Sequence, residues 1–351
     1  MSIPAAAPAV EFGLDTFGDV TADPNGRPLP QPEVLRNVVA EGVLADELGL
    51  DFFGVGEHHR EDFAVSAPEV VLAAIAGKTS RIRLGSAVTV LSSDDPVRVY
   101  ERFATLDAIS NGRAEILVGR GSFTESFPLF GFPLERYEEL FEERLDLLAK
   151  LLTERPVTWS GRTRTALANQ RVFPPTASGA LRTWVGVGGT PESVLRAARH
   201  GFPMMLAIIG GNPLSFAPLV DLYRRVLAEA RRPVDLPVGA HSPGYVAASD
   251  AQAREEAWPH YSAMMTRIGR ERGWRPMARG EYEQAAGPDG ALFIGAPETV
   301  AAKIARVARA LDLSRFDLKY SLGTLPHGNL MESLRLYANE VAPRVRRALE
   351  E

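Results

Sequence analysis

Residues 50–59 read LDFFGVGEHH, an apolar run that ends abruptly in one acid and two imidazoles. The pattern predicts a β-strand over residues 51–55 whose carboxyl end carries polar side chains. Side chains alternate between the two faces of a strand, so His58 and His59 cannot both face one site unless the strand has broken. Taken alone, the segment fits a catalytic strand end or an ordinary hydrogen-bonded loop about equally well.

The same plan occurs twice more along the chain. Residues 114–122 (AEILVGRGS) and 182–190 (RTWVGVGGT) are apolar runs that pass into glycine-rich, polar exits, each followed by a helical pattern. Parallel strands that alternate with helices have all their carboxyl ends on one side, where the loops assemble a site. Polar groups that are distant in the sequence are therefore expected to meet.

Eight predicted strands alternate with helices, which favours a closed α/β barrel, the (β/α)8 or TIM barrel, with insertions, over an open doubly wound sheet. The strands are predicted at residues 10–17, 51–55, 82–91, 114–118, 181–187, 204–209, 238–248 and 316–322. The helices are predicted at residues 33–48, 68–78, 96–109, 134–152, 191–200, 219–230, 250–283, 295–311 and 330–348. Residues 157–173 are predicted to form a short β-rich excursion.

Composition predicts one large domain that handles small molecules. The 351 residues are 45% hydrophobic and 24% charged, and no linker divides them. We therefore expect a single domain over residues 10–351 after a flexible segment, residues 1–9, that lacks the features of a signal peptide. The net charge of -5 gives no reason to expect nucleic acid or an anionic membrane as a partner. The absence of cysteine excludes thiolate sites and suits a cytoplasmic protein.

Residues 186–193 (GVGGTPES) are suited to binding a phosphate. Glycines allow close backbone approach, Thr190 is a natural helix cap, and Pro191 fits the first helical turn. The amides and dipole of a helix start favour an anion, to which Thr190 and Ser193 would add hydroxyl donors. An ordinary capped helix is the alternative, and Glu192 would already satisfy part of the dipole. The dinucleotide fingerprint fails, because Pro191 occupies its third glycine position.

An ordered series of motifs resembles the bacterial luciferase-like family of flavin-dependent monooxygenases from about residue 10 to the last helix. The motifs are EHH (57–59), GSAVTVL (85–91), PVR (96–98), NGR (111–113), GRG (119–121), GGTPES (188–193) and SLGTLPH (321–327). The resemblance implies that Glu57 lies by the flavin ring, that His58 is the catalytic histidine and that Arg120 sits beside the isoalloxazine or its phosphate. It further implies cofactor contacts from Ala87, Val88, Gly119, Val187, Gly188, Gly189, Thr190 and Ser193.

Two details of the resemblance concern single positions. The family has a non-proline cis peptide below the flavin, which would fall at Ala87-Val88, where family members have Ala-Ala. Its luciferase members have a reactive cysteine at the position of Gly119, so light emission from a long-chain aldehyde is not expected here.

The resemblance implies that reduced FMN and O2 oxygenate a small organic substrate. The site must exclude water, and a histidine must move protons, for which the near-neutral pKa of imidazole is suited. Candidates for an apolar lining are Phe12, Phe52, Phe123 and Phe127, with core packing as their alternative role. His327 is either a further group at the same mouth or a helix-start histidine.

Other readings remain open from the sequence. Related barrels use a deazaflavin coenzyme in a similar groove for hydride transfer, so a deazaflavin-dependent reductase or dehydrogenase is a second reading. A third is a flavin-binding protein without catalysis, because some related barrels have lost activity. A metal site from His58, His59 and His241 is not expected, because no HxH or HExxH spacing is present. The family also implies a separate reductase that supplies diffusible reduced FMN, and a homodimer.

Overall fold

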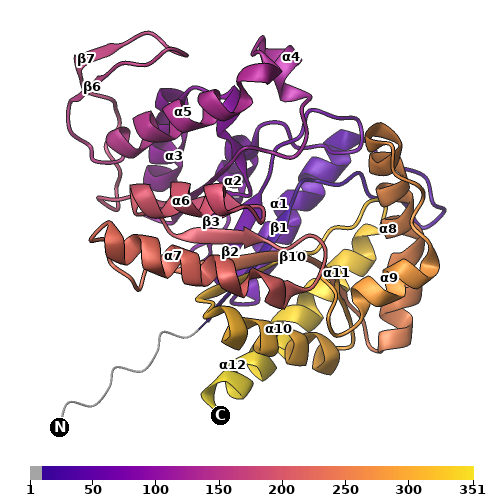
Figure 1. The fold of residues 1–351 in the computed structure, drawn as a ribbon. Helices are drawn as coiled ribbons and strands as arrows, with labels where there is room; N and C mark the ends of the chain where they lie inside the picture. Colours follow the sequence, from indigo (N-terminus) through magenta and orange to yellow (C-terminus); the bar gives the residue numbers. More distant parts are fainter. Residues whose placement is uncertain (1–9) are drawn as a thin grey trace.

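Eight parallel strands close into a barrel within residues 10–351, the part of the chain that the computed structural model describes (Figure 1). They are β1 (Glu11–Thr16), β2 (Phe52–Val55), β3 (Arg83–Ser86), β5 (Ala114–Gly119), β8 (Arg182–Val187), β9 (Met204–Ala207), β10 (Val238–Val246) and β12 (Arg315–Lys319). β12 pairs with both β1 and β10, and β10 also pairs with β9, which closes the ring. The predicted (β/α)8 barrel is confirmed. The predicted flexible segment 1–9 lies outside the described residues.

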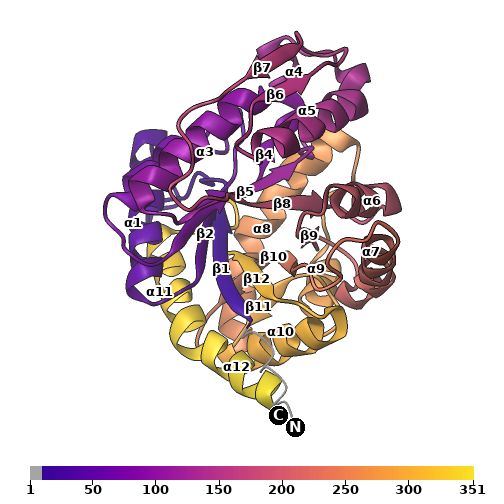
Figure 2. The ribbon, with the colours of Figure 1, turned by 90° about the vertical axis from the view of Figure 1, so that its left-hand side faces the viewer.

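Helices cover the outside of the ring of strands (Figure 2). They are α1 (Gln31–Glu47), α2 (Pro68–Ala76), α3 (Pro96–Ser110), α5 (Tyr137–Leu151), α6 (Pro191–His200), α7 (Ala217–Glu229) and α10 (Pro297–Leu311). Most begin at or beside a proline, whose missing N–H costs no hydrogen bond in the first helical turn. The predicted last helix is in fact three segments, α11 (His327–Leu336), a π-helical turn over Tyr337–Val341, and α12 (Ala342–Glu350).

Two insertions extend the barrel. Between β5 and β8 lie α4 (Ser126–Phe130) and the antiparallel hairpin of β6 (Val157–Trp159) and β7 (Leu167–Gln170). The hairpin confirms the β-rich segment predicted at residues 157–173. Between β10 and β12 lie α8 (Asp250–Arg272), α9 (Arg279–Ala286) and β11 (Phe293–Gly295). The predicted continuous helix over residues 250–283 is wrong, because Gly273 ends α8 in the left-handed conformation with a φ of 71°.

The barrel has an apolar outer layer and a charged interior. In β12, Phe316 and Leu318 pack among the apolar side chains between strands and helices, whereas Arg315, Asp317 and Lys319 alternate with them and lie buried inside the barrel. Most barrels of this type fill the interior with branched apolar residues. This interior was not predicted from the sequence.

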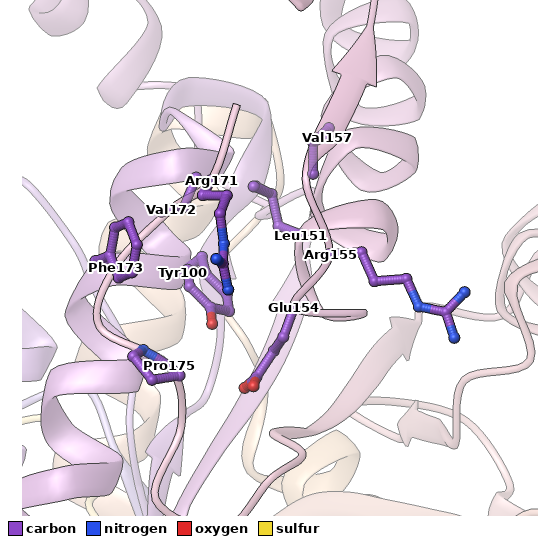
Figure 3. Close-up of a pocket in the computed structure, with 9 residues that line it drawn as sticks. All are labelled: Tyr100, Leu151, Glu154, Arg155, Val157, Arg171, Val172, Phe173 and Pro175. Carbon is purple, nitrogen blue, oxygen red and sulfur yellow. The ribbon is translucent and has the colours of Figure 1, made fainter. Parts of the chain in front are cut away.

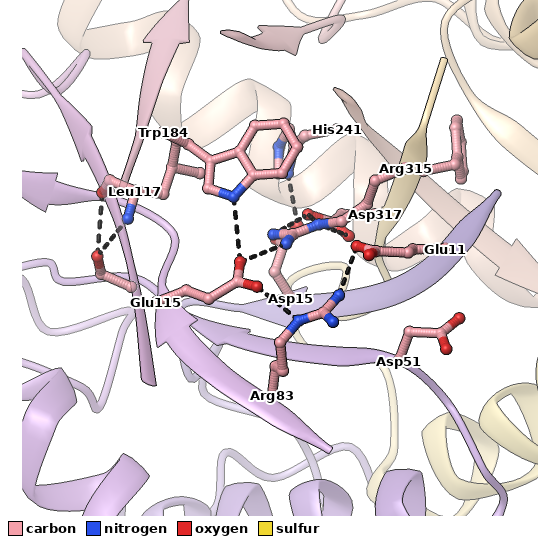
Figure 4. Close-up of polar contacts among 12 residues, drawn as sticks. Glu11, Asp15, Asp51, Arg83, Glu115, Leu117, Trp184, His241, Arg315 and Asp317 are labelled. Atoms are coloured by element: carbon pink, nitrogen blue, oxygen red, sulfur yellow. Dashed lines mark hydrogen bonds and ion pairs between the residues drawn. The ribbon is translucent and has the colours of Figure 1, made fainter. Parts of the chain in front are cut away.

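A network of buried ion pairs fills the centre of the barrel (Figure 4). The side chain of Arg315 is completely buried, and it donates to Glu115 at 2.6 Å and to Asp317 at 2.9 Å. The Trp184 indole donates to Glu115 at 3.1 Å, and the Arg315 guanidinium lies 3.6 Å from the centre of the Phe52 ring. Buried charges require such complete pairing, since an unpaired partner costs several kcal/mol.

Candidate functional site

The mouth of the barrel lies at the carboxyl ends of the strands, and its backbone leaves open space on one side. A Cβ atom at Gly188 or at Gly210 would have no heavy atom within 4 Å. At Gly119 a Cβ atom would lie only 2.8 Å from Val88. The mouth is therefore tightly packed between β3 and β5, and open beside β8 and β9.

Ala87 and Val88 belong to an apolar platform inside the barrel. The peptide bond between them is cis, as the family resemblance implies. It separates β3 from β4 (Thr89–Val90), so the predicted single strand over residues 82–91 is two short strands. The other members of the platform are Leu117, Trp184 and Met205. Gly119 lies against Val88, which brings these three predicted cofactor contacts together.

His58 is held at the mouth by one carboxylate and three aromatic rings. Its Nδ1 lies 3.2 Å from Glu125, and its ring centre lies 4.9, 4.5 and 4.7 Å from those of Phe17, Phe63 and Phe123. Burial alone would raise the pKa of Glu125, but its hydrogen bond to His58 and backbone N–H donors outweigh burial and lower that pKa. A charged Glu125 therefore orients the imidazole.

Glu57 and His59 turn away from His58. His59 Nε2 lies 3.6 Å from Glu57, and the His59 ring packs edge-on against Phe130 at 5.0 Å. The two histidines thus have different neighbours, although β2 ends at Val55 and both lie in the loop that follows it. Glu57 is next to His58 in the chain, but its carboxylate contacts His59.

Arg120 is already paired within the protein. Its guanidinium contacts Glu138 on α5 and lies 5.4 Å from the centre of the Tyr137 ring. Glu138 also pairs with Arg196 of α6 at 3.0 Å. The charge of Arg120 is therefore largely neutralised next to the end of β5, and α5 and α6 are tied together there.

The predicted phosphate segment is the connection from β8 into α6. Val187 ends β8, Gly189 has a φ of 108°, and Thr190 is the helix-cap residue by backbone conformation. The Thr190 hydroxyl does not cap the helix, contrary to expectation, because it points to Ser193 at 3.3 Å. The Ser193 hydroxyl in turn donates to the Thr190 carbonyl at 2.6 Å. No side chain among residues 10–351 accepts from the first amides of α6.

The predicted aromatic lining is only partly correct. Phe12 packs outside the barrel against Tyr337, 6.3 Å away, and Phe127 is buried beside Tyr137 at 5.5 Å, so both serve packing. Phe52 lies inside the barrel beneath the mouth, and Phe123 contacts His58.

Phe17 and Phe63, which also contact His58, were missed. Phe17 follows directly after β1 and lies two residues beyond Asp15, so strand periodicity was the available signal for it.

His327 does not belong to the mouth. Its Nδ1 lies 2.9 Å from Glu41 on α1, and Tyr320 donates to the same carboxylate. His327 is therefore the helix-start residue of α11 and packs against α1, which agrees with the second of its two predicted roles. His241 lies inside the barrel instead, with Nδ1 2.6 Å from Asp15.

A metal centre and a second cleft are the two alternatives to a site at the mouth. Within the described part of the chain, no group of three or more His, Cys, Asp or Glu side chains is arranged to hold a metal ion. A small cleft lies between α3, α5 and residues 171–175 and is lined by Tyr100, Glu154 and Arg171 among others (Figure 3). None of the predicted site residues lines it.

A closed barrel with polar groups at its carboxyl-end mouth places this protein among the α/β-barrel proteins. Residues 11–313 match the model of the luciferase-like monooxygenase family. The chain belongs to this family. No helix in residues 10–351 has the length and apolar character needed to cross a membrane.

A curated relative is N-acetyl-S-alkylcysteine monooxygenase of Bacillus subtilis (strain 168), 30% identical over 235 residues, which cover 65% of each chain. A second is an uncharacterised protein, y4vJ, of Sinorhizobium fredii (strain NBRC 101917 / NGR234), 31% identical over 185 residues, 50% of each chain. The chain thus spans about half to two thirds of the length of these relatives.

Solved structures match the fold over nearly the whole chain. Monooxygenase RslO1 from Streptomyces bottropensis has a TM-score of 0.80 at 23% identity, with 95% of this chain and 99% of that chain covered. The oxygenating constituent of 3,6-diketocamphane monooxygenase of Pseudomonas putida, in complex with FMN, has a TM-score of 0.75 at 18% identity, covering 95% and 98%. The coenzyme F420 dependent tetrahydromethanopterin reductase of Methanopyrus kandleri has a TM-score of 0.71 at 19% identity, covering 95% and 99%.

Proposed function

We propose that this protein is an FMN-dependent monooxygenase that uses reduced FMN and O2 to oxygenate a small organic substrate. The observation that carries the proposal is the start of α6, which opens at the barrel mouth beside Gly188 with no side chain capping its amides. Family membership and the position of His58 at the same mouth support it.

The start of α6 would hold the cofactor phosphate. Pro191 has no N–H and the Ser193 amide donates to the Thr190 carbonyl at 3.2 Å, so the Glu192 amide and the positive end of the helix dipole are what would attract an anion. The open space beside Gly188 gives a phosphate access to this backbone, and the hydroxyls of Thr190 and Ser193 lie next to it. The helices α1, α2 and α10 also begin without a side-chain cap, so the start of α6 points to a phosphate only in combination with the open space beside Gly188.

The flavin ring would lie over the apolar platform that contains Ala87 and Val88. Reduced FMN would supply the electrons that activate O2. The protein's part is to hold the ring, exclude water with apolar side chains, and move a proton at His58. Glu125 fixes the orientation of the imidazole through Nδ1, which leaves Nε2 as the nitrogen that exchanges the proton.

The charges around α6 favour FMN over a deazaflavin coenzyme, whose longer tail needs a basic channel. Arg120 pairs with Glu138, and Arg196 pairs with both Glu138 and Glu142. The cations beside the start of α6 are thus matched by carboxylates, which suits a single phosphate better than a long anionic tail.

A separate reductase and a homodimer complete the proposal. The glycine-rich segment before α6 has Pro191 where a dinucleotide fingerprint needs glycine, so reduced FMN would come from another protein. Analytical ultracentrifugation tests the dimer, and turnover that depends on an added flavin reductase tests the supply of reduced FMN.

Anaerobic titration of the purified protein with reduced FMN, and separately with reduced deazaflavin coenzyme, tests the cofactor. The FMN complex is then mixed rapidly with O2 while the flavin absorbance is recorded. Tight FMN binding and a delayed return of the oxidised flavin spectrum support the monooxygenase. Preference for the deazaflavin supports a reductase or dehydrogenase, tight FMN binding without reaction supports a flavin-binding protein, and no binding of either removes the proposal.

A further inference from the structure

His241 and Asp15 form a second acid–base pair inside the barrel mouth (Figure 4). They come from β10 and β1, which lie on either side of β12, and Asp15 Oδ2 is 2.6 Å from His241 Nδ1. Asp15 is 1% exposed, whereas the side chain of His241 retains 14%. The imidazole is therefore buried on the side of Asp15 and accessible elsewhere.

The free side of His241 points to the mouth. Below it the barrel is filled by Phe52, Trp184 and Arg315, so the open approach comes from the strand ends. The His241 ring is stacked at 6.5 Å on Phe17, and His58 is one of the edge-on neighbours of that phenyl ring, at 4.9 Å. Among residues 10–351, His241 Nε2 makes no hydrogen bond, so this nitrogen is left for a ligand.

The charges around His241 favour its protonated form. Burial would lower the pKa of His241, but the carboxylates of Asp15 and Asp317 outweigh burial and the nearby Lys319, so the pKa is raised. Asp15 Oδ1 is also buried without a hydrogen-bond partner. A buried carboxylate that holds one ring nitrogen fixes the imidazole so that the other nitrogen carries the exchangeable proton.

We propose that His241, oriented by Asp15, is a second proton donor of the site and acts on oxygen derived from O2. The inference rests on the proposed function. In the absence of substrate, bound reduced FMN would supply two electrons and one proton to O2, and His241 would supply the second proton that H2O2 requires. The N–H bond at Nε2 breaks, an O–H bond of H2O2 forms, and water reprotonates the imidazole.

The test combines the titration of His241 in the apo-protein with the oxidation of reduced FMN by O2. Histidine side-chain NMR of the wild type should show a raised pKa for His241, which Asp15→Asn lowers. Reoxidation of bound FMN should slow as the pH rises through that pKa. His241→Gln should slow the reoxidation of bound FMN at least ten-fold and remove its pH dependence. Asp15→Asn should instead shift the pH dependence of the reoxidation to lower pH.

His200→Gln is the matched control, because His200 lies in the last turn of α6 and stacks on Phe202. It should leave both the rate and its pH dependence unchanged. If the wild type binds no reduced FMN, the proposed function fails and this inference with it. If the wild type binds and reoxidises FMN but His241→Gln keeps the wild-type pH profile, only the inference is overturned.

Discussion

His58 is the residue on which the proposed chemistry depends most directly. It combines a carboxylate partner with three aromatic neighbours, so its imidazole is fixed in direction while remaining next to the open mouth. Fixed orientation is what a general acid–base group needs in order to meet the reacting atoms.

We expect His58→Gln to slow substrate oxygenation by about 10²- to 10⁴-fold, the usual contribution of a positioned acid–base group. The dissociation constant for reduced FMN should stay within a few-fold of the wild type, because the phosphate would bind at α6. Mass spectrometry of products from a panel of organic substrates and a flavin titration measure the two effects. Loss of FMN binding together with activity would show a structural role for His58.

Gly13 is a residue whose missing side chain is needed for packing. A Cβ atom at Gly13 would lie 2.0 Å from an Asp317 oxygen, in the centre of the charged network. We expect Gly13→Ala to lower the free energy of unfolding by about 1–3 kcal/mol, because Asp317 would have to leave Arg315. Urea denaturation measures the change.

Gly188→Ala is the matched substitution, since its new methyl group meets no heavy atom within 4 Å. Its free energy of unfolding should stay within about 0.5 kcal/mol of the wild type. Equal stability losses in the two variants would contradict the packing argument.

At the scale of elements, the uncapped start of α6 predicts a conflict between stability and cofactor binding. Thr190→Asp would supply a carboxylate to the first helical amides, which typically stabilises by about 0.5–2 kcal/mol. The same carboxylate would occupy and repel the phosphate site, so we expect a higher melting temperature and at least ten-fold weaker FMN binding. Thermal melts and flavin titrations measure both.

Ser249→Asp provides the control, because Ser249 already caps α8 through the Gln252 amide at 3.2 Å. This change should leave FMN binding unaltered. Unchanged FMN affinity in Thr190→Asp would remove α6 as the phosphate site.

Element boundaries were predictable where a single pattern governs them. The helix over residues 191–200 agrees in full, and the strands agree within a few residues, because apolar runs and proline starts mark them clearly. The residue pattern did not predict two breaks: Gly273 ends α8 inside a continuous helical pattern, and the third strand stops before the cis peptide at residues 87–88, which only the family resemblance implied. Local pattern does not report such tertiary constraints.

At the scale of the whole molecule, the charged interior gives the stability a particular pH dependence. Burial raises the pKa of Asp317 to about 6, although Arg315 beside it acts in the opposite direction. A carboxyl with a raised pKa holds its proton more tightly in the folded state. Its contribution to stability is therefore complete below the unfolded value near 3.8 and is lost as the pH rises through about 6.

We therefore expect the wild type to lose more stability than Asp317→Asn between about pH 4 and pH 7. Urea denaturation at several pH values measures the difference between the two proteins. Carboxyls with a lowered pKa, such as Glu115 and Glu125, make stability rise with pH instead. Both proteins contain these carboxyls, so subtracting one stability curve from the other largely cancels their effect. Parallel stability curves would contradict a raised pKa at Asp317.

The closed barrel was predictable because strand exits repeat along the chain, and that same repetition brought Glu57, His58 and the α6 start to one mouth. The polar interior was not. The residues RFDLK at 315–319 alternate between polar and apolar, as in a strand that has one face exposed to solvent. Only closure of the barrel turns the polar face inward. The pair of Asp15 and His241 was missed for the same reason, since 226 residues separate the two.

The charged network also constrains how the chain is made. Glu115 leaves the ribosome 200 residues before Arg315, the partner that completes its pairing. Until that arginine emerges, Arg83 and Arg182 can pair with only one oxygen of Glu115, and the oxygen that faces Arg315 in the barrel lacks its cation. Burying an incompletely paired carboxylate is costly, so this side of the half-barrel favours water. Synthesis must therefore be almost finished before the interior can close, and truncated chains should remain open to proteases and chaperones.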